Sequence, residues 1–325
     1  MESAAETARR AAAEVAGADA APSVRAAHPV AVRGERRSAG SVLRDYVALT
    51  KPRIISLLLL TTVAAMFVAD PEGPALSAVL WTVLGGYLAA GGAGAINHYL
   101  EREADARVAR TRGRPLASGR IEPAHGLVFG IALGALAVVE LAVTVNALAA
   151  ALALGGLLGY ALVYTLWLKP LTPQNIVIGG AAGAIPPLVG WAAATGGLGP
   201  GALYLFAVVF LWTPPHFWAL ALLIKDDYAR TGVPMLPVVR GEATTRRQIL
   251  LYALALLAVT PLPFASGLFG VPYLVSGLAL GAGFAGLAAW LCARPSRRAA
   301  LRLYLASLAY LALLFTVMAL DRAIW

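Results

Sequence analysis

Charge is scarce in this chain of 325 residues: Asp, Glu, Lys and Arg make up 13% of it, whereas 59% of the residues are hydrophobic. The mean hydropathy is +0.74. A soluble globular protein carries about twice that share of charged residues, so the composition excludes a soluble enzyme and favours a chain embedded in lipid. The single cysteine, Cys292, lies in an apolar run, which excludes a disulfide framework.

Long apolar runs take the place of the missing charge. A helix needs about 20 residues to cross the roughly 30 Å hydrocarbon core of a bilayer, and backbone groups in hydrocarbon must satisfy one another, which favours helices over barrel strands for runs of this length. The predicted spans are 54–69, 77–97, 124–142, 147–168, 175–194, 201–224, 247–267, 272–292 and 299–320. The predicted fold class is therefore an all-α integral membrane bundle of nine transmembrane helices, forming one domain over residues 42–325.

Basic residues are distributed unequally between the ends of these spans. They precede the first span and occupy alternate loops, with the densest group between Arg102 and Arg120, whereas the first opposite loop holds only Asp70 and Glu72. The positive-inside rule then predicts a cytoplasmic N-terminus and an outside C-terminus. This asymmetry accounts for the net charge of +9 without a nucleic-acid partner. Residues 1–41 contain no apolar run, and they are predicted to be a disordered cytoplasmic tail.

Acidic residues are concentrated in the stretch NHYLEREADARVARTRGRPL, residues 97–116, at the end of the second span. On a helix, Asn97, Glu101 and Asp105 are each four residues apart and share one face. Glu103 points the other way and is predicted to pair with an arginine or to be solvated. Two carboxylates and an amide oxygen suit Mg²⁺, which completes its coordination with water and substrate phosphate. The stripe therefore predicts a metal site for a phosphorylated substrate.

Arginines follow this acidic stripe directly. Gly113 and Pro115 break the helix, so the later arginines are predicted to lie in a loop that can fold back toward the acids. The planar guanidinium fork suits phosphate oxygens. An anchor to lipid headgroups is the alternative for the arginines alone, but it does not explain the acids. The group comprises Arg107, Arg110, Arg112 and Arg114.

A second acidic patch ends the sixth predicted span, where Asp226 and Asp227 are adjacent. Since about 100° separates neighbouring residues on a helix, only one of them faces inward, and Asp227 is the one predicted to do so; a solvated helix end is the alternative. Lys169 and the string TKPR (50–53) lie at the same predicted membrane face. Cations around two acidic patches are what a departing diphosphate with Mg²⁺ requires.

Taken together, these strings resemble the UbiA-type intramembrane prenyltransferases, whose first motif N-x-x-x-D-x-x-x-D lies on helix two and whose second acidic motif lies on helix six. Within that family the resemblance is closest to the branch of protohaem IX farnesyltransferases. Glu101 stands where the family usually has Asp, and Pro170 stands where many members have Arg. The matching strings are DYVALTKPR (45–53), NHYLEREADARVARTRGRPL (97–116), WLKPLTPQNIVIGGAAGAIPPLVGW (167–191), TPPHFWAL (213–220) and DDYARTGVPMLPVV (226–239).

The resemblance implies roles for individual residues. The implied catalytic and Mg²⁺-binding residues are Asn97, Glu101, Asp105 and Asp227. The implied diphosphate contacts are Lys51, Arg53, Arg110, Arg114 and Lys169. Residues expected to contact haem or the prenyl chain are His216, Trp218, Tyr160 and Tyr164, and the aromatic faces, with that of Phe217, are expected to stabilise an allylic cation.

The implied reaction moves a farnesyl group from farnesyl diphosphate to a vinyl group of haem b, with water addition, giving haem O and pyrophosphate. The implied setting is the bacterial inner membrane, with the active site facing the cytoplasm and a haem A synthase as a downstream partner. A quinone-precursor acceptor is the nearest alternative. A transporter would place charge near the bilayer midplane, and a structural subunit would not need the acidic stripe.

Overall fold

The computed structural model describes residues 38–324. Contacts divide the chain into Met1–Ser41 and Val42–Trp325, and the second unit is the one described below. The predicted tail, residues 1–41, lies outside the described residues up to position 37. Helix α2 (Ala39–Thr50), which the hydropathy pattern did not predict, precedes the first span. Its Asp45 carboxylate is buried and accepts hydrogen bonds from Arg120, which ties α2 to the connection after α4.

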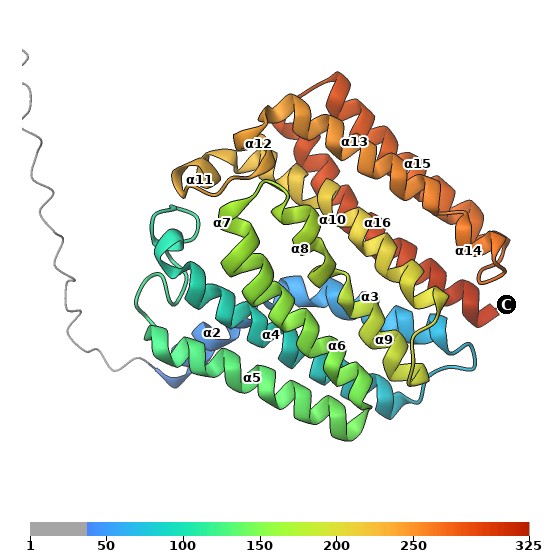
Figure 1. Cartoon of the computed structure of the whole chain (residues 1–325), viewed down its shortest axis with the longest axis horizontal. Helices are drawn as coiled ribbons and strands as arrows, with labels where there is room; N and C mark the ends of the chain where they lie inside the picture. The colour runs from blue at the N-terminus through green and yellow to red at the C-terminus, as the bar shows by residue number, and fades with distance from the viewer. Residues whose placement is uncertain (1–37, 325) are drawn as a thin grey trace, which may run out of the picture. The chain divides into compact units, whose positions relative to one another are not determined.

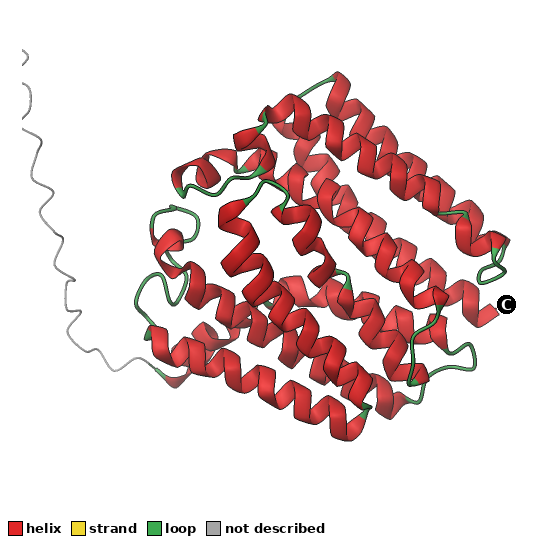
Figure 2. Ribbon diagram, viewed as in Figure 1, coloured by secondary structure: helices red, strands yellow, loops and turns green. Residues whose placement is uncertain are grey.

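Nine helices within residues 38–324 are long and apolar enough to cross a membrane, and no strand occurs among them, which confirms the predicted fold class (Figures 1 and 2). Three spans are composite: α6 (Ala147–Leu158) continues through the π-helix η1 (Gly159–Leu168) into α7 (Lys169–Leu171), α8 (Asn175–Gly183) is followed by α9 (Ile185–Thr195), and α13 (Gly241–Val259) by α14 (Leu262–Ala265). The others are α3 (Pro52–Ala69), α4 (Leu76–Ala106), α5 (Pro123–Thr144), α10 (Pro200–Leu223), α15 (Val271–Ala293) and α16 (Arg297–Ile324). The short helices α11 (Lys225–Arg230) and α12 (Leu236–Val239) connect α10 to α13.

Small residues allow neighbouring spans to approach backbone to backbone. On α4, a Cβ added at Gly92 would lie 2.7 Å from the carbonyl oxygen of Gly130 and 2.9 Å from the amide nitrogen of Gly134, both on α5. Helices in lipid associate through close packing of this kind, because burying an apolar side chain against another helix gains little free energy when the surrounding lipid is equally apolar. The largest buried cluster lies instead among α10, α13, α15 and α16 and is built from bulky side chains such as Tyr273 and Phe315.

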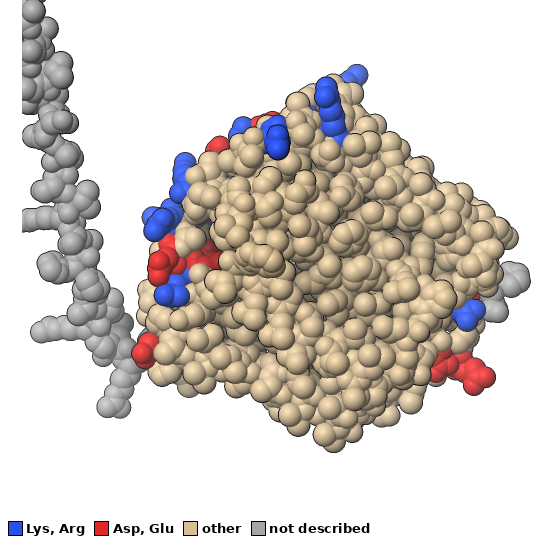
Figure 3. All heavy atoms as spheres, viewed as in Figure 1, with Lys and Arg blue, Asp and Glu red and all other residues tan. Residues whose placement is uncertain are grey.

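Charged side chains gather along one edge of the bundle. In Figure 3, Lys and Arg lie with several acids along the edge that carries α11 and α12 in Figure 1, a smaller group lies at the opposite edge, and the surface between shows no charge in this view. Large apolar side chains are exposed along the spans, among them Val139 on α5 and Leu251 on α13. An exposed apolar belt between two charged rims is the surface expected of a membrane-spanning bundle.

Two helices follow the course predicted for them. The second span was predicted to end at 97 with the acidic stripe continuing it as helix, and α4 does continue as far as Ala106. Helix α10 passes through Pro214 and Pro215 without a break and ends at Leu223. Proline in a membrane helix is tolerated where neighbouring helices satisfy the freed backbone groups, and here α10 packs against α13 and α16.

Candidate active site

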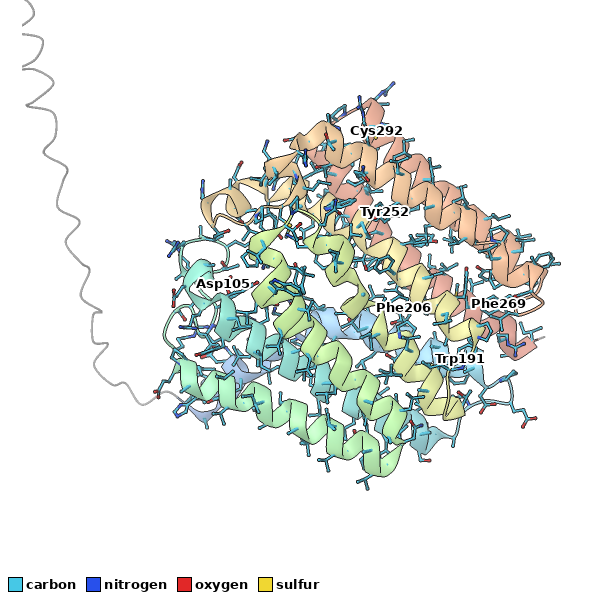
Figure 4. All side chains as sticks on the ribbon, viewed as in Figure 1. Asp105, Trp191, Phe206, Tyr252, Phe269 and Cys292 are labelled. Atoms are coloured by element: carbon cyan, nitrogen blue, oxygen red, sulfur yellow. The ribbon has the colours of Figure 1, made fainter. Side chains whose placement is uncertain are left out.

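A cavity of about 670 Å³ opens among α3, α4, η1, α9 and α10. Its lining on α4 extends from Gly86 to Asp105, which at 1.5 Å per residue is roughly 28 Å along the helix. Charged side chains line the end near Asp105, and apolar ones such as Leu58, Leu157 and Val189 line the deeper part within the spans. Figure 4 shows Asp105 at the end of the bundle that carries α7 and α11. The cavity, called the first cavity below, thus joins a polar mouth to an apolar chamber.

The predicted stripe on α4 faces this mouth. Asn97, Glu101 and Asp105 all line the first cavity, and Asn97 and Asp105 are buried. Glu103 lies on the other face of the helix, where its exposed carboxylate pairs with Arg102 at 3.1 Å. The helical period therefore places Asn97, Glu101 and Asp105 on the face that lines the cavity, as predicted, and Glu103 on the other face.

Two lysines from other segments hold the first two positions of the stripe. The Lys51 ammonium donates to Oδ1 of Asn97 and, at 3.4 Å, to the hydroxyl of Tyr160. Lys169, at the end of the fourth span, pairs with Glu101. Both lysines line the first cavity. Each of these cations therefore lies between a protein oxygen and the space where a ligand would bind.

Two arginines hold the remaining acids in the same manner. Nη1 of Arg114 donates to both carboxylate oxygens of Asp105, at 2.9 and 2.7 Å. Nε of Arg110 lies 3.3 Å from Oδ2 of Asp227. Asp227 lines the cavity, whereas the neighbouring Asp226 is exposed and does not. The loop after α4 thus folds back onto its own acids and onto α11, as the helix-breaking residues predicted.

Lys51 has an unusual backbone conformation. Its φ of 58° and ψ of 54° lie in the left-handed region, and it is the only non-glycine with positive φ among the described residues. Such strain persists where the surrounding structure fixes it, and it clusters at functional sites. On α4, a Cβ at Gly94 would meet the carbonyl oxygens of Leu49 and Thr50 at 3.0 and 3.2 Å, so α4 presses directly on this turn. Burial lowers the pKa of Lys51 to about 8, with Glu101 opposing the shift.

Thr165 sets the orientation of the Asn97 amide. Its hydroxyl donates to the carbonyl of Tyr160 at 2.8 Å and accepts from Nδ2 of Asn97 at 3.0 Å. Because that amide group points to Thr165, Oδ1 faces Lys51 and the cavity. Thr165 belongs to η1, and π-helical turns recur at functional sites because they redirect side chains locally. Thr165 was not among the predicted site residues, although a polar residue within an apolar span was the available signal.

Tyr228 is a second lining residue that was not predicted from the sequence. It follows Asp227 on α11 and lines the first cavity. Burial raises the pKa of Tyr228 to about 12, so its phenol stays neutral at physiological pH. Its position directly after the second acidic patch was the available signal.

The donor set fits Mg²⁺ bound together with a diphosphate. Asn97, Glu101, Asp105 and Asp227 offer the amide and carboxylate oxygens that hard cations take, and they line one cavity with four cations. Among the described residues, no three acid, His or Cys side chains converge closely enough to hold a metal by themselves. Mg²⁺ in this mouth would therefore share its coordination between protein oxygens and the phosphates of a substrate.

Three residues predicted to contact substrate lie elsewhere. Arg53 is exposed on the first turn of α3 and does not line the first cavity. His216 is buried between α10 and α16, where Nδ1 lies 2.7 Å from the Ser307 hydroxyl. Trp218 is 2% exposed and faces away from the first cavity. Tyr160, Tyr164 and Phe217, by contrast, line it. A helix turns about 100° per residue, so neighbours in TPPHFWAL necessarily face different elements.

Comparisons with known proteins agree with this architecture. The model of the "UbiA prenyltransferase family" matches residues 58–315. A "Protoheme IX farnesyltransferase" from Roseiflexus sp. (strain RS-1) is 54% identical over 285 residues, which cover 88% of this chain and 53% of that protein, so the chain spans about half the length of this relative. A relative with the same name from Symbiobacterium thermophilum is 53% identical over 88% of this chain and 97% of its own length.

A solved structure extends the comparison to the fold. A UbiA homolog from Archaeoglobus fulgidus bound to DMAPP and Mg²⁺ superposes with a TM-score of 0.62, covering 84% of this chain and 99% of its own, at 16% identity. At that identity the likeness concerns the fold alone. The family model and the close relatives together show that this membrane-spanning chain belongs to the UbiA prenyltransferase family.

Proposed function

We propose that this chain transfers the farnesyl group of farnesyl diphosphate to a vinyl group of protohaem IX, with addition of water, giving haem O and pyrophosphate. The observation that carries the proposal is the first cavity, which joins four paired cations at its mouth to an apolar chamber. The acceptor and the prenyl group are those in the name of relatives that are more than half identical to this chain.

The mouth of the first cavity binds the diphosphate in this proposal. Its four cations, Lys51, Arg110, Arg114 and Lys169, exceed its three carboxylates by one, which favours an anionic ligand. A bound diphosphate offers these cations charged phosphate oxygens as acceptors. The protein oxygens that the cations release then face the diphosphate and are free to bind a metal ion together with it. Mg²⁺ bound there supplies charge neutralisation for the leaving pyrophosphate.

The apolar chamber holds the isoprenoid chain. Leu58, Leu157 and Val189 come from three different spans and line its depth. Tyr160 and Tyr164 stack with ring centroids 5.7 Å apart and line the cavity between the chamber and the cations. An aromatic face attracts positive charge, so these rings stabilise charge that develops on the allylic carbon as the diphosphate departs.

The bonds balance as follows. The C1–O bond of farnesyl diphosphate breaks and its electron pair leaves with pyrophosphate, while the terminal vinyl carbon forms a bond to C1. The cation left on the inner vinyl carbon takes up water and loses a proton, which gives the hydroxyl group. Apolar walls delay this addition until the new carbon–carbon bond has formed. We place the site at the cytoplasmic face of a bacterial inner membrane, with a haem A synthase using the product.

Mass spectrometry of haem tests the proposal. Membranes from cells that express the chain are given haem b, farnesyl diphosphate and Mg²⁺, and the extracted haem is compared with that from membranes lacking the chain. We expect haem O only when all three are present. An equimolar aromatic quinone precursor is included as a competing acceptor. Prenylation of that acceptor with no haem O would assign the chain to the other branch of the family.

A further inference from the structure

The apolar chamber of the first cavity has a floor of packed chain. Lining residues at its deep end come from four spans, and none of them is more than 7% exposed. They are Thr62 on α3, Ala89 on α4, Ala153 on α6 and Val189 on α9. The last three also belong to one buried apolar cluster, which continues behind them through residues such as Ala149. The side chains of this cluster close the chamber at that depth.

Exposed lining residues lie at the other end of the cavity. All of them are in the half of the bundle nearer Asp105, and they are Ile54, Arg110, Leu166, Pro170 and Phe217. A second cavity, of about 610 Å³ and lined by Trp218 and Tyr252 among others, shares no lining residue with the first, so the chamber does not extend into it. A chain that runs down the chamber from the mouth therefore meets the floor.

One face of α4 follows the chamber from the metal stripe to the floor. Ala90 and Gly86 precede Asn97 by seven and eleven residues and line the same cavity. At 100° per residue, both lie within about 20° of Asn97 around the helix. At 1.5 Å per residue, Ala90 is about 10 Å and Gly86 about 16 Å below Asn97. Helix α3 gives the same depth, because Lys51 and Thr62 are also eleven residues apart.

This depth matches the length of a farnesyl chain. An extended carbon chain advances about 1.2 Å per bond, which gives roughly 8 Å for a geranyl, 13 Å for a farnesyl and 18 Å for a geranylgeranyl chain. With the diphosphate at the level of Asn97, a farnesyl chain ends just above the floor, whereas a geranylgeranyl chain is too long for the chamber. The third isoprene unit of the farnesyl chain then lies between the levels of Ala90 and Gly86.

We propose that the closed depth of the chamber selects the length of the prenyl group, and that Ala90 is the residue whose small side chain admits the third isoprene unit. The proposal rests on the proposed function, which assigns the prenyl diphosphate to this cavity. Side chains on a helix tilt toward its N-terminus, which for α4 is the direction of the floor. A larger side chain at Ala90 therefore fills the space of the third unit and leaves that of the first two.

Binding of three prenyl diphosphates to the purified full-length chain in detergent, with Mg²⁺ and without an acceptor, tests this assignment. We expect the wild type to bind farnesyl diphosphate most tightly and geranylgeranyl diphosphate at least tenfold more weakly. Ala90→Leu should lower the affinity for farnesyl diphosphate about 5- to 150-fold, the range expected when a side chain is forced into occupied space. Its affinity for geranyl diphosphate should stay within about twofold of the wild type, which verifies the fold. Ala135→Leu adds the same side chain on an exposed face of α5 outside the cavity and should bind all three like the wild type.

A second position separates chain length from general packing. Ala93 lines the cavity one turn nearer the mouth, and Ala93→Leu should weaken geranyl as well as farnesyl diphosphate. Equal affinity of the wild type for the farnesyl and geranylgeranyl compounds overturns the assignment, and this comparison needs no variant. Equal losses for geranyl and farnesyl diphosphate in Ala90→Leu overturn it as well.

The same variants distinguish this assignment from the proposed function. If Ala90→Leu loses the preference for farnesyl diphosphate while the wild type forms no haem O, the chain-length assignment stands and the proposed function falls. If the wild type forms haem O while Ala90→Leu binds farnesyl diphosphate as tightly as the wild type, the proposed function stands and the chain-length assignment falls.

Discussion

Replacing Thr165 by valine should weaken Mg²⁺ binding without touching any metal ligand. The substitution keeps the shape of the side chain but removes the acceptor for Nδ2 of Asn97. An unpaired buried amide donor costs about 1 to 3 kcal/mol, which corresponds to a factor of about 5 to 150 in an equilibrium constant. If the Asn97 amide flips to avoid that cost, its oxygen leaves the cavity. Loss of partners behind metal ligands typically lowers metal affinity about 10- to 100-fold.

The assay is pyrophosphate release as a function of Mg²⁺ concentration. For Thr165→Val we expect half-saturation at about tenfold higher Mg²⁺, with most of the maximal rate recovered at high Mg²⁺. Thr165→Ser retains the hydroxyl and should follow the wild type. Thr61→Val is the matched control, since Thr61 is also buried and its hydroxyl donates to the carbonyl of Leu58 on its own helix, its one hydrogen bond among the described residues. A wild-type Mg²⁺ curve for Thr165→Val, or an equal defect in Thr165→Ser, would refute the role given to this hydroxyl.

Asp105→Asn should lower pyrophosphate release by about two orders of magnitude, since it removes charge at the reacting diphosphate. Glu101→Asp should stay active, because the flexible coordination shell of Mg²⁺ can absorb the loss of one methylene. Equal effects of the two variants would contradict the proposal that this stripe of residues binds Mg²⁺. Gly190→Ala should destabilise the bundle by about 1 to 3 kcal/mol in thermal unfolding, because its Cβ would collide with the main-chain carbonyl of Thr62 on α3. Gly286→Ala is the control and should unfold like the wild type, because its Cβ would meet nothing within 4 Å. Asp321→Ala should lower the free energy of unfolding by about 2 to 4 kcal/mol, because this buried carboxylate accepts hydrogen bonds from two backbone amides at the start of α15. An unchanged unfolding midpoint would show that other groups satisfy these two amides.

Features that depend on local periodicity could be predicted from the sequence. Apolar runs gave the membrane spans because length and hydropathy are decisive in lipid, and the four-residue spacing placed Asn97, Glu101 and Asp105 on one face. The adjacent acids on α11 were resolved by the same argument, with Asp227 inward and Asp226 exposed. Hydropathy ended the second span at 97, and the spacing of the stripe predicted that the helix continues beyond it, as α4 does to Ala106.

Contacts between distant segments were decided by the tertiary structure alone. Lys51 meets Asn97 across 46 positions of sequence and Lys169 meets Glu101 across 68, so no local pattern could pair them. The same holds for Thr165, which a π-helical segment turns toward Asn97.

The motif TPPHFWAL shows most clearly what the sequence could predict and what only the tertiary structure revealed. Its composition marked it as distinctive, but the rotation of α10 sends its residues to three surroundings: His216 to α16, Phe217 to the first cavity and Trp218 to the second. By itself, the sequence determined that the chain is a membrane-spanning helical bundle with a stripe of acids followed by arginines at one face, because helix period and hydropathy are properties of neighbouring residues. Which cation holds which oxygen, and which aromatic ring faces which cavity, only the packing of the helices decided.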